Sequence, residues 1–290
     1  MDRNALRLPV ILTVLLLALF WGGNAVALKI GLRQIPPFAS AGLRFTISLL
    51  IIVIWGLMHR VRLRPHRNEW LPLLPLGILF AAQIGCFNWG TNLTHASRAV
   101  VMINTYPLFV AVFAHFIVPG DRLTARKVGG LILAFAGVIV VFRENLSSGR
   151  IVGDLLALSS GIQLALIIVL TNRLVQTIDA VRLLVAQMVV GVPIFFLLSA
   201  VFEGGEVVRL SHDIVLAIVY QGVVVGGFCF IVWTLLLKNN SPSRMSVLFF
   251  TTPLWGLSLS YLLLGDPVTV SLAVGAVLVA LGIYLSNKVG

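Results

Sequence analysis

Residues 97–124 read SRAVVMINTYPLFVAVFAHFIVPGDRLT, and residues 243–269 read SRMSVLFFTTPLWGLSLSYLLLGDPVT. Both stretches open with Ser-Arg, carry a proline ten residues later, and end with a Gly-Asp pair that precedes a Thr. The offset between the copies is 146 residues up to the proline and 145 after it, about half of the 290-residue chain. Glycines beyond each copy continue the match, with Gly130 and Gly137 corresponding to Gly275 and Gly282. The sequence therefore predicts an internal duplication.

The rest of the chain is apolar enough to lie in lipid. Hydrophobic residues make up 59% of it, charged residues only 11%, and the mean hydropathy is +1.04. A soluble domain carries roughly 25% charged residues, and a helix crosses a bilayer with about 20 apolar residues. We therefore expect an all-α integral membrane protein with ten transmembrane helices, at residues 10–30, 38–58, 70–91, 98–118, 125–142, 152–173, 181–200, 213–237, 244–263 and 269–287.

The net charge of +11 follows the predicted loops rather than a nucleic-acid surface. With the N-terminus in the cytoplasm, fourteen Lys and Arg residues fall on the inner side and seven on the outer side, with a cluster at Arg60–Arg67. This positive-inside bias predicts a multi-pass membrane protein with both termini cytoplasmic. The first apolar run contains Asn24 and Lys29 and lacks a small-residue cleavage site, so we expect a retained helix rather than a signal peptide.

An odd number of helices in each copy makes the duplication inverted. We expect a first five-helix repeat at residues 1–143, a polar linker at 144–150, and a second repeat at 151–290. Five crossings reverse the direction of the chain, so a pseudo-two-fold axis in the membrane plane should relate the repeats around a central cavity. This arrangement is typical of transporters that work by alternating access.

Short motifs in both copies resemble the drug/metabolite transporter superfamily, EamA type. They are Trp21-Gly22-Gly23-Asn24 with Lys29, Arg44-Phe45, and the two repeated blocks around Pro107 and Pro253. The resemblance covers the whole chain and implies a ten-helix exporter of amino acids or other metabolites in the bacterial inner membrane. It also implies that helices one to four and six to nine line the cavity, with five and ten peripheral. The chain departs from the family in having Asp121 and Asp266 where Glu is frequent, and Gln163 near a position that is often aromatic.

Acidic residues are predicted only in loops or near helix ends, with none at mid-membrane. A proton-driven pump for lipophilic cations normally needs a buried carboxylate that exchanges proton for substrate, so multidrug antiport is disfavoured. A membrane enzyme or metal site would need clustered carboxylates or histidines. We therefore expect no enzymatic activity, no metal and no cofactor.

The polar residues expected at mid-membrane are neutral amides, and aromatic residues accompany them. Amides bond both carboxylate and ammonium groups, and aromatic rings cover an apolar side chain or hold an ammonium. An interhelical hydrogen bond is the alternative role for each amide. The predicted substrate-binding set is Trp21, Asn24, Gln83, Phe87, Asn88, Asn104, Gln163 and Trp233.

Five further residues have predicted roles outside this set. Pro107 and Pro253 occupy equivalent positions inside helices, where a proline frees a carbonyl and bends the axis, so both are candidate hinges. His115 is a candidate coupling residue because histidine titrates near neutral pH. Lys29 and Arg44 are expected near the outer helix ends, where they either attract a carboxylate or reach toward lipid phosphates.

These features favour a secondary transporter that exports neutral or aromatic amino acids, or similar small metabolites, by alternating access. The alternatives are a multidrug or other metabolite exporter of the same fold and, less favoured, a passive channel, for which no filter-like segment is found. The expected partners are a small-molecule substrate and the lipid bilayer. Neither nucleic acid nor an obligate protein partner is indicated.

Overall fold

The computed structural model describes residues 8–118, 124–143, 150–204, 211–240, 242, 245 and 248–287. Several features of the sequence prediction lie outside these residues. They are both extreme termini, the Gly120-Asp121 pair, linker residues 144–149 and the Ser243-Arg244 pair.

The described chain is helical throughout, as predicted. The first half contains α1 (Leu8–Gly31), α2 (Pro37–Met58), η1 (Arg67–Glu69), α3 (Trp70–Leu93), α4 (Ala96–Ile103), α5 (Tyr106–Ile117) and α6 (Ala125–Arg143). The second half contains α7 (Ile151–Leu174), α8 (Ala180–Phe202), α9 (His212–Val219), the π-helix η2 (Tyr220–Cys229), α10 (Phe230–Asn239), η3 (Phe249–Thr251), α12 (Thr252–Leu264) and α13 (Val270–Asn287).

Within the described ranges, seven helical segments are long and apolar enough to cross a membrane. They are Leu8–Gly31, Pro37–Met58, Arg67–Leu93, Ala96–Ile117, Ile151–Leu174, Ala180–Phe202 and His212–Asn239. Three shorter apolar helices, Val128–Val140, Leu254–Leu264 and Val270–Gly282, occupy the places of the remaining predicted crossings.

Both candidate hinge prolines stand in the first turn of a helix. The predicted fourth helix stops at Ile103, turns at Asn104 and Thr105, and resumes as α5 with Pro107 in its first turn. Pro253 likewise lies in the first turn of α12, directly after η3. Proline is tolerated there because the first-turn N–H has no partner within the helix. The break at Asn104-Thr105 is thus sharper than the expected kink.

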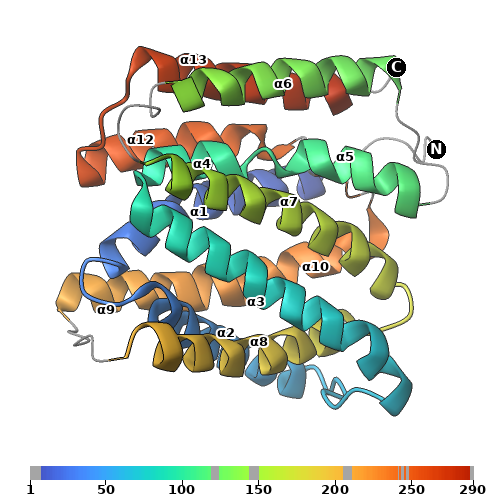
Figure 1. The fold of residues 1–290 in the computed structure, drawn as a ribbon. Coiled ribbons are helices and arrows are strands. Elements are labelled where there is room, and N and C mark those ends of the chain that lie inside the picture. The colour runs from blue at the N-terminus through green and yellow to red at the C-terminus, as the bar shows by residue number, and fades with distance from the viewer. Residues whose placement is uncertain are drawn as a thin grey trace.

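Helices α6 and α13 pack together at one edge of the bundle (Figure 1). A Cβ atom added at Gly137 would lie 2.7 Å from the carbonyl oxygen of Gly275, and one at Gly282 would lie 2.5 Å from that of Gly130. Only glycine permits so close an approach of two backbones. The contacts run in opposite chain directions, so the two helices are antiparallel.

Helices α2 and α8 show the same antiparallel relation. A Cβ at Gly42 would contact the ring of Phe196, whereas one at Gly56 would contact Val181. The remaining large contacts also join the two halves, since α3 packs on α7 and α8, α1 packs on α12 and α9, and η2 packs on α2. The two halves are therefore interleaved rather than side by side. The core between α2, α3 and α8 contains the rings of Phe45, Phe80 and Phe195.

Candidate functional site

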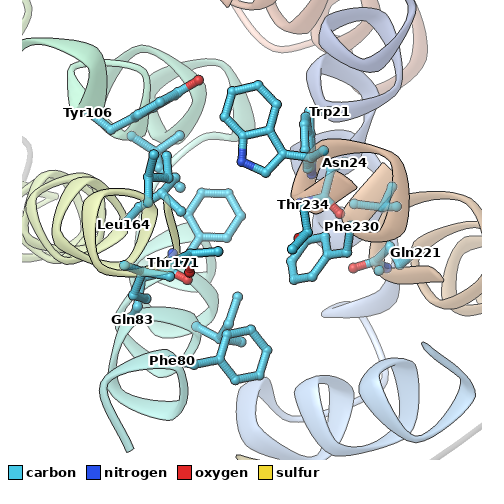
Figure 2. Close-up of a pocket in the computed structure, with 18 of the residues that line it drawn as sticks. Trp21, Asn24, Phe80, Gln83, Tyr106, Leu164, Thr171, Gln221, Phe230 and Thr234 are labelled. Atoms are coloured by element: carbon cyan, nitrogen blue, oxygen red, sulfur yellow. The ribbon is translucent and has the colours of Figure 1, made fainter. Parts of the chain in front are cut away.

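A cavity of about 150 Å³ lies among the helices of both halves (Figure 2). Its walls come from α1 to α5, α7, α8, η2, α10, η3 and α12, and none of its described lining residues belongs to α6 or α13. An apolar cavity of this volume holds a benzene-sized molecule. The cavity reaches the last turns of α7 and α10 at Thr171 and Leu237 and the second turn of α8 at Leu184.

Six residues of the predicted binding set line this cavity: Trp21, Asn24, Gln83, Phe87, Asn104 and Trp233. Trp21 and Asn24 stand on one wall and Gln83 on the opposite wall (Figure 2). The amides of Gln83 and Asn104 already have partners, since Gln83 donates to the Ser160 hydroxyl at 2.7 Å and Asn104 to its own helix. The side-chain oxygen of Asn24 is buried and has no hydrogen-bond partner within the described part of the chain.

Gln163, expected on the cavity wall, lies outside the lining. Its amide donates to the Ser159 hydroxyl at 3.0 Å and to Cys86 Sγ at 3.5 Å, on the side of α7 that packs on α3. The neighbouring stripe of α7 faces the cavity instead, through Leu164, Ile167, Ile168 and Thr171. Successive residues are about 100° apart around a helix, so an error of one position moves a side chain off the wall.

Asn88 also lies behind the wall rather than on it. Its Nδ2 donates to the carbonyl of Pro37 at 2.8 Å, and its Oδ1 accepts from Nη2 of Arg44 at 2.8 Å. His115 is exposed near the end of α5, beside the ring of Phe116, and does not line the cavity.

Aromatic rings form one side of the cavity, and sequence reasoning identified only part of them. The ring centroids of Trp21 and Trp233 lie 6.0 Å apart, and Phe249 lies 5.3 Å from Trp21 and 5.1 Å from Trp233. Phe230 then connects Trp21 to Phe45, at 6.2 and 5.9 Å. No repeat match or motif in the sequence singled out Phe249 or Phe230.

Arg44 is the main residue that the predicted set omitted. It lines the cavity, only 3% of it is exposed, and its guanidinium lies 4.7 Å from the Phe45 ring centroid. Its Nη1 donates to Oε1 of Gln221 at 2.9 Å, and its Nη2 donates to Asn88. Arg44 is the eighth residue of α2, which places it about 10 Å along the helix from its start. This depth within an apolar run is the feature of the sequence that indicates a position inside the bundle.

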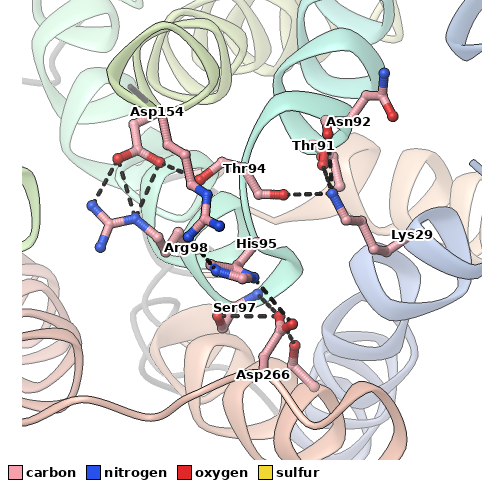
Figure 3. Close-up of polar contacts among 11 residues, drawn as sticks. Lys29, Thr91, Asn92, Thr94, His95, Ser97, Arg98, Asp154 and Asp266 are labelled. Atoms are coloured by element: carbon pink, nitrogen blue, oxygen red, sulfur yellow. Dashed lines mark hydrogen bonds and ion pairs between the residues drawn. The ribbon is translucent and has the colours of Figure 1, made fainter. Parts of the chain in front are cut away.

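A polar network lies at one end of the bundle, beyond the cavity (Figure 3). We call it the end network. It comprises Lys29, His95, Ser97, Arg98, Arg150, Asp154, Ser260 and Asp266. Arg98 donates from Nη2 to Oδ2 of Asp154 at 2.7 Å, and both residues are buried. This ion pair joins α4 to α7. Lys29 Nζ donates to the carbonyls of Thr91, Asn92 and Thr94, so it caps the end of α3 rather than reaching for lipid.

Asp266 organises the other half of the end network. It accepts hydrogen bonds from the hydroxyls of Ser260 at 2.6 Å and Ser97 at 3.3 Å, and its Oδ1 lies 3.3 Å from Nδ1 of His95. Nη1 of Arg150 lies 2.6 Å from Nε2 of His95, which must accept because a guanidinium only donates. Burial alone would raise the pKa of Asp266, but its hydrogen bonds and His95 together lower that pKa below its ordinary 3.8.

Comparison with known proteins identifies the same pattern twice in the chain. The model of the EamA-like transporter family matches residues 8–143 and again 151–288. An uncharacterized transporter of Archaeoglobus fulgidus is 28% identical over 284 residues, covering 95% of this chain and 97% of its own. A protein of Escherichia coli named "probable amino-acid metabolite efflux pump" is 26% identical, covering 94% and 92%. A solved crystal structure has the same fold, with a TM-score of 0.73 at 21% identity over 96% and 95% of the two chains.

Proposed function

Because the chain belongs to the EamA-like transporter family, within the drug/metabolite transporter superfamily, we propose that it exports neutral or aromatic amino acids, or similar small metabolites, by alternating access. The observation that carries this proposal is the cavity between the two halves. Its described lining combines amides and aromatic rings with one guanidinium and no carboxylate. Such a lining suits a small solute with a polar group and an apolar body.

The inverted repeat is part of the proposal, with the boundaries 1–143, 144–150 and 151–290 and ten crossings. Two observations support it. The family model matches once in each half. The packing also places the corresponding helices α6 and α13 antiparallel, with Gly137 against Gly275 and Gly130 against Gly282. In the sequence repeat, by contrast, Gly130 corresponds to Gly275 and Gly137 to Gly282, so each glycine contacts the counterpart of the other. Crosswise contact of equivalent residues is what a two-fold axis produces.

Alternating access draws support from the difference between the two ends of the cavity. The end network ties α4 to α7 and to the segment after α12, which closes that end. The cavity extends instead toward Thr171, Leu184 and Leu237. With both termini in the cytoplasm of a bacterial inner membrane, the end network lies outside and the cavity extends inward. This is the state from which an exporter loads substrate.

Transport into proteoliposomes tests the substrate class. We expect saturable uptake of radiolabelled neutral or aromatic amino acids, measured with and without an imposed pH gradient and against protein-free liposomes. Flux that rises linearly without saturation would identify a channel instead. Uptake of lipophilic cations but of no amino acid would identify a multidrug exporter and refute the amino-acid assignment.

Topology is tested independently of transport. A reporter fused within Arg60–Arg67 should read cytoplasmic, because this loop holds the densest positive charge in the chain. A second fusion at residues 205–210, between α8 and α9 in the sequence, should read external. A reversed pair of signals would overturn the orientation and place the end network on the cytoplasmic side.

A further inference from the structure

A buried cation faces the cavity without a counter-anion in the described structure. Arg44 is 3% exposed, and both groups to which its guanidinium donates are neutral amides. Arginine stays charged in proteins, and a buried charge is costly unless an opposite charge accompanies it. From this residue and the cavity beside it, we infer that Arg44 is a carboxylate subsite, so that the transported solutes are organic acids or amino acids. This inference rests on the proposed function and names the substrate class of the same cavity.

The two amides hold the guanidinium in place and cannot replace the missing anion. Nε2 of Gln221 donates to the carbonyl of Ala217 at 3.2 Å, and Nδ2 of Asn88 donates to the carbonyl of Pro37. These bonds fix each amide so that its oxygen faces Arg44. Gln221 lies in the π-helix η2, a type of segment frequent at functional sites. Gln221 and Asn88 therefore act as positioning residues for the cation.

Donor capacity of Arg44 remains unused. A guanidinium has more N–H donors than the two that these amides take up, and Nε of Arg44 is buried with no partner among the residues that the structure describes. A carboxylate is the group that a guanidinium binds best, through two parallel N–H···O bonds. The free donors and the missing charge thus call for the same ligand group.

The rest of the cavity fits the remainder of such a molecule. Two other buried polar atoms without partners, Oδ1 of Asn24 and Oγ1 of Thr252, belong to residues that line the cavity. The asparagine oxygen can accept from an ammonium group. Phe45 and Phe230 continue the apolar wall from Arg44 to Trp21. The favoured ligand is therefore a carboxylate with an apolar or aromatic body, and an α-ammonium is accommodated.

Three probes that differ by one group separate the contribution of the carboxylate to binding from that of the ammonium. They are phenylalanine, 3-phenylpropionate, which lacks the ammonium, and phenylethylamine, which lacks the carboxylate. We expect the two carboxylates to bind the purified full-length protein, measured by calorimetry and by ligand-induced thermal stabilisation, and phenylethylamine to bind at least tenfold more weakly. Arg44→Gln should weaken both carboxylates at least tenfold, and Arg44→Lys should recover part of the loss because it restores charge without the planar fork.

Arg33→Gln is the matched control, because it removes the same charge from an exposed position beyond α1. It should leave binding unchanged, and size-exclusion profiles should show that all variants are folded. Equal carboxylate binding by the parent and Arg44→Gln would overturn the subsite, as would tighter binding of phenylethylamine or no carboxylate binding at all. Transport is read separately in proteoliposomes. Saturable uptake that Arg44→Gln leaves intact would refute the subsite alone, whereas carboxylate binding without any transport would refute the proposed function alone.

Discussion

Arg44 and Arg98 are equally buried arginines in two regions of the molecule with opposite surroundings. Arg98, in the end network, is 4% exposed and forms an ion pair with Asp154, which is fully buried. Arg44, on the cavity wall, is 3% exposed, and its partners in the described residues are two amides. The end network pairs its buried arginine with a carboxylate of the same network and so can hold the two halves together. The cavity wall leaves a charge for a ligand to complete.

The largest expected effect comes from removing the anion of the completed pair. Asp154→Asn removes the buried carboxylate to which Arg98 donates, and breaking a buried pair from one side costs about 3–5 kcal/mol. We expect a marked fall in the midpoint of thermal unfolding in detergent and a loss of folded protein. Arg44→Gln should leave the midpoint unchanged or raise it, because it removes a buried charge that has no counter-anion. Equal destabilisation by both variants would abolish the distinction between the two regions.

The next effect is on transport and distinguishes neutral amides on and off the cavity wall. Asn24→Ala removes, from a residue that lines the cavity, an acceptor that has no partner among the described residues, and we expect several-fold to tenfold slower uptake with normal insertion. Gln163→Ala removes an amide that bonds Ser159 and Cys86 instead, and it should transport at nearly the parental rate. Initial uptake rates of the two variants and the parent, normalised to inserted protein, measure this difference. Equal slowing by both variants would move the binding region toward α3 and α7.

A smaller effect follows from replacing the ion pair as a whole. The double variant Arg98→Met, Asp154→Leu removes both charges together, and such apolar replacements are often neutral or stabilising. We expect it to regain most of the unfolding midpoint that Asp154→Asn loses. If the midpoint stays low, the pair stabilises the end network through its geometry as well as through its charge balance.

The smallest effect concerns the acid range. The pKa of Asp266 is lowered in the folded protein, so its stabilising contribution is complete above the unfolded value near 3.8 and is lost as the pH falls through the lower folded value. The parent should therefore be more stable than Asp266→Asn at pH 7, and the difference should shrink below pH 3.8. Thermal midpoints of the two proteins, measured from pH 7 to pH 3, test this. A difference that stays constant with pH would show that the charge of Asp266 contributes nothing.

The helices could be predicted from the sequence because each depends on a local property, a long apolar run between polar turns. The duplicated motif added the expectation of two related halves. The end network could not be predicted from the sequence, because its hydrogen bonds join residues far apart in the chain, such as Arg98 with Asp154 and Ser97 with Asp266. These partners meet only after the two halves interleave.

The candidate site was predicted in part, and its errors have geometric causes. Trp21 and Asn24 could be placed on the cavity because they share one face of a single helix. Gln163 was displaced by the rotation of α7, which no pattern in its own sequence specifies. Arg44 was assigned to a helix end because it lies early in α2, although it faces the cavity.

The unpaired charge of Arg44 also makes the transport cycle sensitive to voltage. A bound organic acid without an ammonium cancels this charge, whereas a zwitterionic amino acid adds no net charge and leaves the net charge of the cavity unchanged. The empty cavity keeps the positive charge within the membrane field, which does work of about 2.3 kcal/mol per elementary charge across 100 mV. When the substrate of the proposed carrier is an organic acid, a membrane potential negative inside therefore acts mainly on the return of the empty carrier and favours the orientation that is ready to load.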